Sequence, residues 1–220
     1  MHISRKLIVS LVICAAVFCA GCTQNLSSKV PVAPVTVSVP VADPAQLALT
    51  QSDVPQGFAM VESRAKTPAD VSKLALDLGW QDGYEVRFSS PAQVGRGGDE
   101  IIQSIAIYQE RTIPDVITLA EQQGRSDSDL TYTDLKVRGL GNNARAFSGK
   151  ASAQILIKPA DANPILAGMN KNEVQAVFKN EVAEIIFSKG NTFEVFRMTG
   201  PSPDTVLLVN LAEKAYAKIP

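Results

Sequence analysis

Thiol and imidazole side chains occur only near the start of this chain. Its 220 residues include three cysteines, Cys14, Cys19 and Cys22, and a single histidine, His2. Ser-His-Asp and Cys-His nucleophile systems need an imidazole or a thiolate with a pKa near neutral. Zinc, haem and iron-sulfur sites also use mainly Cys and His ligands. Whether the working protein has this chemistry therefore depends on what happens to its first residues.

The N-terminal residues are arranged like a secretory signal. Two basic residues, Arg5 and Lys6, precede an apolar run over residues 7–20, and the small pair Ala20-Gly21 ends the run. A membrane-spanning helix needs about 20 apolar residues, so a run of about 14 is short for that role. A basic start, a short apolar stretch and small residues before a cleavage point define a signal peptide. We therefore predict export, with residues 1–21 as the signal.

Cys22 stands directly after Ala20-Gly21, at the predicted cleavage point. This arrangement resembles the lipobox of bacterial and archaeal lipoproteins, in which a membrane lipid alkylates the cysteine and the chain is cut just before it. The resemblance implies a lipid on Cys22. It also implies anchoring to the outer face of the cytoplasmic membrane, or to an outer membrane where the cell has one. The alternative is an uncleaved signal anchor in which the cysteines are merely small apolar residues.

Cleavage before Cys22 would leave a chain with no histidine and no unmodified thiol. We therefore expect no nucleophile system of these types, no cofactor, no disulfide scaffold and no enzymatic activity. Loss of Arg5 and Lys6 changes 21 basic residues to 19, against 22 acidic ones, a formal charge of −3. The sequence has no cluster of basic residues. Because phosphate binding starts from clustered Lys and Arg, we expect no nucleic-acid partner.

The exported chain divides into a tether and one domain. Residues 22–46 hold the lipid site and a stretch rich in Pro and Val, which is typical of an extended, disordered tether. Residues 47–220 have the length of a single domain. Helical spacing and capping residues predict helices over 67–78 and 114–123 and from 202 to the C-terminus. Alternating patterns predict strands over residues 84–88, 101–108, 144–148 and 154–157, and a hairpin that joins 182–188 to 192–199.

This order of elements predicts an α+β domain with an antiparallel sheet backed by about three helices on one face. It is similar to the PsbP-like domains of exported lipoproteins, over about 170 residues and without a signature motif. That resemblance implies a curved antiparallel sheet and an accessory or binding role.

Two groups of residues are candidates for ligand or metal binding. Trp80, Asp82 and Tyr84 place aromatic faces beside polar groups, which suits a sugar or peptide, although closure of the core by Trp80 is the favoured interpretation. Asp127, Asp129 and Asp134 gather hard oxygen ligands of the kind that calcium prefers. Their spacing differs from an EF-hand, and acidic loops with Ser and Thr are usually caps and turns.

Two further patterns have simpler explanations. The glycines at 139 and 141 fit the spacing of a dinucleotide-binding loop, but the residues after them resemble a strand, so a turn is favoured. Paired carboxylates can hydrolyse glycosides without histidine. The acidic residues considered for that role are Asp82, Asp99, Glu100 and Asp129.

The sequence thus predicts a lipid-anchored, non-catalytic binding or accessory module for an envelope protein or a small ligand. The alternatives are a carboxylate-dependent, glycoside-type hydrolase and a passive envelope spacer. Two carboxylates about 5 to 9.5 Å apart across a pocket would favour the hydrolase. An exposed apolar patch or an open sheet edge would favour a binding module.

Overall fold

The protein is described here from a computed structural model covering residues 42–92, 98–151 and 180–220. Residues Pro40–Pro220 form one compact unit. The predicted signal, the lipid site at Cys22 and the predicted strand over 154–157 lie outside the described residues.

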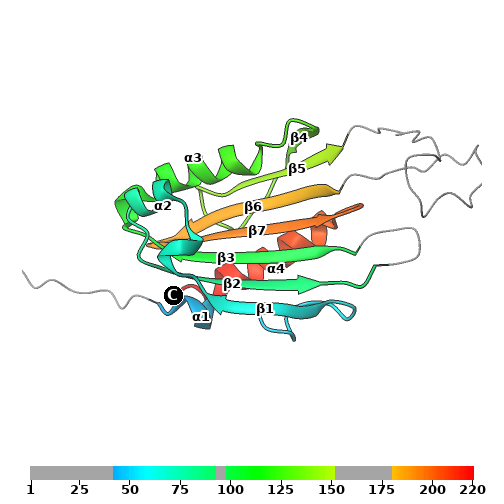
Figure 1. Ribbon diagram of the computed structural model, residues 1–220, viewed down its shortest axis with the longest axis horizontal. Coiled ribbons are helices and arrows are strands. Elements are labelled where there is room, and N and C mark those ends of the chain that lie inside the picture. The colour runs from blue at the N-terminus through cyan, green and yellow to red at the C-terminus, as the bar shows by residue number, and fades with distance from the viewer. Residues whose placement is uncertain (1–41, 93–97, 152–179) are drawn as a thin grey trace, which may run out of the picture. The chain divides into compact units, whose positions relative to one another are not determined.

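One antiparallel sheet organises the described residues (Figure 1). It has seven strands in the order β1-β2-β3-β7-β6-β5-β4, and all neighbours run antiparallel. The α+β class and the antiparallel sheet predicted from the sequence are therefore confirmed. The strands are β1 (Ala59–Ala65), β2 (Asp82–Ser89), β3 (Glu100–Ile107), β4 (Leu130–Asp134), β5 (Arg145–Ala151), β6 (Glu181–Lys189) and β7 (Thr192–Gly200).

The chain builds this sheet from its two edges towards the middle. Strands β1, β2 and β3 form a meander, and helix α3 (Ile113–Gly124) then carries the chain to the far edge at β4. Strands β4 to β7 return inwards, and β7 pairs with β3. The β6–β7 hairpin was predicted correctly, and Gly190 in its turn has a φ of 58°, which glycine adopts readily.

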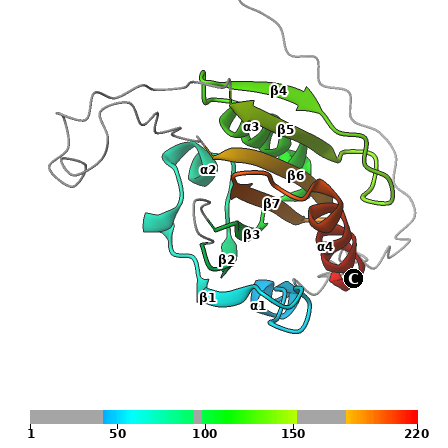
Figure 2. The same cartoon turned by 90° about the vertical axis from the view of Figure 1, so that its right-hand side faces the viewer.

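The two long helices lie on opposite faces of the sheet (Figure 2). Side chains alternate along a strand, and on β6 Ile186 packs with α3 whereas Ile185 and Phe187 pack with α4 (Thr205–Lys218). The expectation that the helices cover one face is therefore wrong. The reason is visible in β6, where every residue from Val182 to Phe187 is buried, as in a strand covered on both sides.

The helix predicted over residues 67–78 is broken in two. Thr67 and Asp70 form the expected capping box, but only a 3₁₀ turn, η1 (Pro68–Asp70), follows it. Val71 is extended, and Ser72 then caps a second short helix, α2 (Lys73–Asp77), by accepting a hydrogen bond from the backbone N–H of Ala75. Two competing N-caps five residues apart thus divide one helical pattern. Only two long helices, α3 and α4, back the sheet in the described residues, rather than about three.

Four elements were not predicted, and one of them is a short 3₁₀ turn, η2 (Glu110–Thr112), which leads into α3. Strand β1 alternates weakly and has a register shift between Met60 and Glu62, and β4 lies within the stretch interpreted as a calcium-binding loop. Helix α1 (Pro44–Leu47) lies at the end of the stretch assigned to the tether, and Leu47 is buried in the core. Residues 44–46, which were assigned to the tether, therefore belong to the folded domain.

A buried polar pair lies between the sheet and helices α1 and α4. The Gln103 amide nitrogen donates to a carboxylate oxygen of Glu194 at 2.8 Å, and the Gln103 amide oxygen accepts from the backbone N–H of Leu49 at 2.7 Å. The second oxygen of Glu194 is buried and has no hydrogen-bond partner. Burial raises the pKa of Glu194 to about 7, although the Gln103 hydrogen bond and the charge of Lys218 oppose the shift.

Helix α4 begins with a side-chain cap whose removal should be measurable. Asp204 Oδ1 accepts hydrogen bonds from the backbone N–H groups of Val206 and Leu207, both at 3.0 Å. We expect Asp204→Ala to lower the free energy of unfolding by about 1 kcal/mol, as for other N-caps. Urea denaturation would measure this loss, with the exposed Glu213→Ala on the same helix as the control. A loss no larger than that of the control would contradict the capping role.

Candidate functional site

The face of the sheet that carries α3 contains a pocket of about 260 Å³, which we call the α3 pocket. It lies between the sheet and the C-terminal turn of α3. Its lining residues are Lys66, Glu85, Ile102, Ser104, Ala120, Gln123, Gly124, Glu184, Val195 and Arg197.

Strand register explains why these side chains meet. Glu85 on β2, Ser104 on β3 and Val195 on β7 are consecutive partners in one row across the sheet. Ile102, Arg197 and Glu184 form the next row along the strands. Residues two apart on a strand share a face, so both rows form the floor of the α3 pocket. The floor is therefore set by four central strands, which are rigid elements.

One side of the pocket holds a largely buried ion pair. Lys66 Nζ lies 2.9 Å from Glu85 Oε2, and their side chains are 14% and 12% exposed. Lys66 Nζ also donates to Ser104 Oγ at 2.7 Å. Burial raises the pKa of Glu85, but hydrogen bonds and charges from Lys66 and Arg87 outweigh burial and leave the pKa below its ordinary value. Glu85 is therefore held as a carboxylate at neutral pH.

The opposite side of the pocket holds a second ion pair, in which the carboxylate is much more buried than the cation. Arg197 Nε donates to Glu184 Oε2 at 2.6 Å, and the Glu184 side chain is 2% exposed whereas that of Arg197 is 40% exposed. Burial raises the pKa of Glu184 above its ordinary value, although Arg197 and Arg125 oppose the shift. The two carboxylates of the pocket thus have pKa values displaced in opposite directions.

Gly124 allows the end of α3 to approach this second pair. A Cβ atom built there would lie 2.5 Å from Phe147 Cζ and close to Glu184 Oε1. We expect Gly124→Ala to lower the free energy of unfolding by about 1 to 3 kcal/mol, because overpacking of a tight contact costs that much. Thermal denaturation would measure the loss, with the exposed neighbour Gln122→Ala as the matched control. Equal stability of the two variants would show that α3 does not need this close approach.

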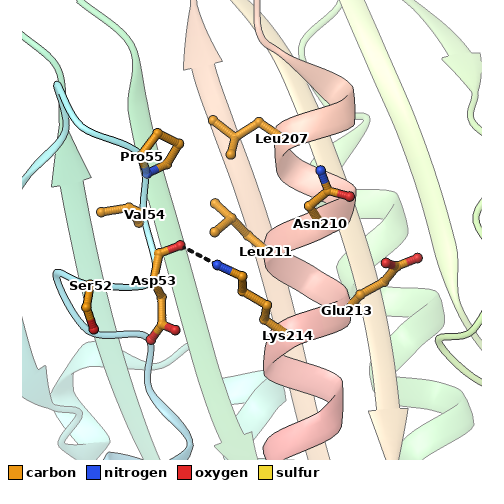
Figure 3. A pocket seen from close by; sticks show the side chains of 9 residues that line it. All are labelled: Ser52, Asp53, Val54, Pro55, Leu207, Asn210, Leu211, Glu213 and Lys214. Carbon is orange, nitrogen blue, oxygen red and sulfur yellow. Dashed lines mark hydrogen bonds between the residues drawn. The ribbon is translucent and has the colours of Figure 1, made fainter.

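A second hollow, the α4 groove, lies on the other face of the sheet (Figure 3). Its volume is about 520 Å³, and residues 52–55 and α4 form its walls. Val54, Pro55, Leu207 and Leu211 give it an apolar part. Lys214 closes one end by donating to the backbone oxygen of Asp53 at 2.9 Å. The groove is the larger hollow, but the charged side chains on its rim are exposed or hydrogen-bonded to the chain itself.

The structure does not bring Trp80, Asp82 and Tyr84 into one site. Trp80 packs with the core cluster under α3, and its indole ring lies over Gly83. Tyr84 packs with the cluster under α4, and its hydroxyl group is hydrogen-bonded to Ser63 Oγ at 2.9 Å. Asp82 accepts a hydrogen bond from the backbone N–H of Gly83. The two aromatic rings therefore lie on opposite faces, and closure of the core by Trp80 is the better interpretation.

The proposed calcium ligands do not converge either. Asp134 lies in β4 and pairs with Arg125, whereas Asp127 accepts a hydrogen bond from the backbone N–H of Asp129 in the preceding turn. In the described ranges no group of three or more His, Cys, Asp or Glu residues has the geometry to hold a metal ion.

The carboxylates considered for hydrolysis are also dispersed. Asp82 and Glu100 lie at opposite ends of the β2–β3 pair, because Asp82 pairs with Ile107 and Glu100 pairs with Ser89. Seven residues of strand separate these ends, about 24 Å at 3.4 Å per residue. Asp82 and Glu100 are thus too far apart for the spacing of about 5 to 9.5 Å between carboxyl groups that glycosidases use. Within the α3 pocket, Glu85 and Glu184 lie three strands and one row apart, about 16 Å at the backbone.

The sequence did contain a signal for the α3 pocket. Glu184 interrupts the apolar run of β6, and Arg197 interrupts the apolar alternation of β7. Charged residues within strands that are otherwise buried require a partner or a functional reason. Lys66, which follows β1, gave no comparable signal because β1 itself was not predicted.

Comparisons with known proteins identify the fold. No protein-family model and no curated protein matches the sequence. Among solved structures, the extracellular domain of PknH from Mycobacterium tuberculosis is similar, with a TM-score of 0.54 and 10% sequence identity. The match covers 82% of this chain and 97% of that domain. The two chains share a fold. At this identity the likeness concerns the fold alone.

Membrane-spanning helices were searched for in the described ranges. None of the helices there is long and apolar enough to cross a bilayer.

Proposed function

We propose that this chain is an exported, lipid-anchored binding domain without catalytic activity, and that its ligand is a small polar molecule held in the α3 pocket. The signal-like N-terminus and Cys22 support export and anchoring. The fold shared with an extracellular domain is compatible with such a location.

The observation that carries this proposal is the buried charge in the α3 pocket. Four charged side chains line a hollow of about 260 Å³, and Glu184 is almost fully buried there. Replacing a buried ion pair by apolar residues of similar volume is often neutral or stabilising, so such pairs contribute little to folding. Carboxylates with displaced pKa values in a pocket are characteristic of functional sites. A ligand site accounts for both features, whereas a passive spacer does not require them.

The hydrolase is less well supported than the binding domain. Glycoside hydrolysis requires two carboxylates that act on one bond, whereas Glu85 and Glu184 stand on β2 and β6 with two strands between them. Each carboxylate is also occupied by a cation, Lys66 or Arg197.

Anchoring can be tested at Cys22. We expect Cys22→Ser to yield an unprocessed precursor without lipid, because the serine hydroxyl group does not replace the thiol in the lipobox reaction. Mass spectrometry of the membrane fraction would show the mass of the precursor for the variant and of a lipidated chain starting at residue 22 for the wild type. Cys19→Ser is the matched control and should be processed. Normal cleavage of the Cys22→Ser chain would contradict the anchor.

Ligand binding can be tested by filling the pocket. Ala120 on α3 lines it, and Ala120→Leu adds three carbon atoms there while keeping a good helix former. A small-molecule library would be screened by thermal shift against the wild type, this variant and the control Thr118→Leu, which lies on the exposed side of α3. A ligand at about 100 times its Kd should raise Tm by about 5 to 10 °C in the wild type and the control only. Equal shifts in Ala120→Leu, or no shift with any compound, would contradict the proposal.

A further inference from the structure

We infer that the α3 pocket binds a small zwitterion, a molecule with one ammonium and one carboxylate group, which is the chemistry of a free amino acid. This inference rests on the proposed function, because it names the ligand class of the same pocket.

The volume of the pocket limits the size of the ligand. A space of about 260 Å³ holds roughly nine water molecules at about 30 Å³ each. A ligand of roughly nine non-hydrogen atoms would therefore fill it. Free amino acids have this size, whereas a folded partner or an oligosaccharide does not fit within the pocket.

Hydrogen-bond donors for a carboxylate come from three side chains. Lys66 Nζ uses two of its three N–H groups on Glu85 and Ser104, which leaves one. The Ser104 hydroxyl accepts from Lys66, so its own proton is available to a ligand. Arg197 uses Nε on Glu184, and its two Nη groups make no ion pair within the described part of the chain. These donors lie over β3 and β7, in the middle of the pocket floor.

Acceptors for an ammonium group lie at the other side, where α3 ends. Glu184 uses Oε2 for Arg197, and its Oε1 faces the position of Gly124. The C-terminus of a helix carries a partial negative charge from its last carbonyl groups, which stabilises cations. Gln123, in the same turn, adds an amide oxygen to the lining. An ammonium group placed there gains a carboxylate, an amide and the helix end together.

The charge balance of the pocket favours binding of a zwitterion over binding of singly charged ligands. Lys66 and Arg197 balance Glu85 and Glu184, so the lining has no net charge. A ligand with only a carboxylate would bring a third negative charge into the pocket, and a ligand with only an amine would bring a third positive charge. An uncompensated buried charge costs several kcal/mol. A zwitterion avoids this cost because each of its charges faces an opposite one.

Isothermal titration calorimetry with the purified full chain tests this inference. The panel contains free amino acids, their N-acetyl and methyl-ester derivatives, a dicarboxylate, a diamine and a neutral monosaccharide. We expect at least one free amino acid to bind, and its N-acetyl and methyl-ester derivatives to bind at least about tenfold more weakly, because each loses one charge-assisted interaction. Equal binding of the blocked derivatives would overturn the inference.

Two double variants keep the pocket neutral while removing its charges. Lys66→Gln with Glu85→Gln, and Glu184→Gln with Arg197→Gln, should each weaken amino acid binding at least about tenfold. The exposed pair Lys73 and Asp77, replaced by Gln and Asn, is the control and should leave affinity unchanged. Tighter binding of the dicarboxylate, the diamine or the sugar, abolished by the pocket variants, would overturn the zwitterion and leave the small-ligand function standing. The absence of any ligand from all these classes would overturn both.

Discussion

Replacing Glu194 by Gln is expected to abolish about 3 kcal/mol of pH dependence in the stability of this domain. Glu194 is fully buried on β7, and burial raises its pKa from 4.5 to about 7. Its Oε2 accepts from Gln103, and its buried Oε1 has no partner. A glutamine has the shape of the protonated acid and cannot ionise, so it reproduces the low-pH state at every pH.

The direction in which stability changes with pH follows from whether the folded or the unfolded state holds the Glu194 proton. The unfolded chain releases the Glu194 proton near pH 4.5, whereas the folded chain holds it up to about pH 7. Between these values the folded state binds one more proton, so the free energy of unfolding falls by about 1.4 kcal/mol for each pH unit. The stability from this group is complete below pH 4.5 and is lost by about pH 7. Over 2.5 units the loss is about 3 kcal/mol.

Urea denaturation of the wild type and Glu194→Gln from pH 4 to pH 8 would measure this effect as the difference between the two curves. The curves should agree at pH 4, and the variant should be more stable by about 3 kcal/mol at pH 8. Gln103→Glu would place a second acid beside Glu194 and should steepen the dependence. Parallel curves for the wild type and Glu194→Gln would show that the carboxyl group titrates normally.

The second large effect concerns the ion pair of the α3 pocket. Arg197→Ala removes the partner of Glu184, whose side chain is 2% exposed. Breaking a buried pair costs about 3 to 5 kcal/mol when a charge is left uncompensated. Because Arg197 itself is 40% exposed and Arg125 also acts on Glu184, we expect a loss near 2 to 3 kcal/mol at pH 7.

A double variant separates the charge from the packing of the arginine. Glu184→Gln with Arg197→Ala leaves no buried charge, and we expect it to recover at least about 1 kcal/mol relative to Arg197→Ala alone. Chemical denaturation of the four members of this cycle gives the coupling energy. If the double variant were as unstable as Arg197→Ala, the loss would come from packing of the arginine stem, and Glu184 would not need a partner.

Local signals predicted much of the fold correctly. The β6–β7 hairpin and helices α3 and α4 each combine periodic apolar residues with a clear turn or cap, such as Gly190 or Asp204. Strand β1 lacks such a signal because its residues are mostly exposed at the sheet edge. The distribution of helices over two faces was encoded in β6, whose buried residues are apolar on both faces apart from Glu184, but this pattern was interpreted only as a strand.

The candidate site was harder to predict because its residues are distant in sequence. Lys66, Ser104 and Arg197 come together only through the register of strands β1, β2, β3 and β7, which no local pattern specifies. The aromatic residues Trp80 and Tyr84, by contrast, are close in sequence but separated by the sheet. The reason is that Trp80 precedes β2, which begins at Asp82, so the alternation of the strand does not extend to it.

The structure also has surface features that suit a partner protein, the other kind of ligand considered from the sequence. Strands β1 and β4 are open sheet edges in the described residues, and Val206 is exposed on α4 next to the α4 groove. These features are available for a partner protein. They lack the buried charges that distinguish the α3 pocket, and for that reason we propose the pocket as the binding site.

Amide chemical-shift mapping with a free amino acid that binds in calorimetry tests the location of the site most directly. If the ligand lies in the α3 pocket, we expect the shifts to cluster at Ser104, Gly124 and Val195, which line the pocket from a helix and two strands. Saturation of these shifts should follow the calorimetric Kd. Shifts that cluster instead at Asn210 and Lys214 would place binding in the α4 groove and contradict the account.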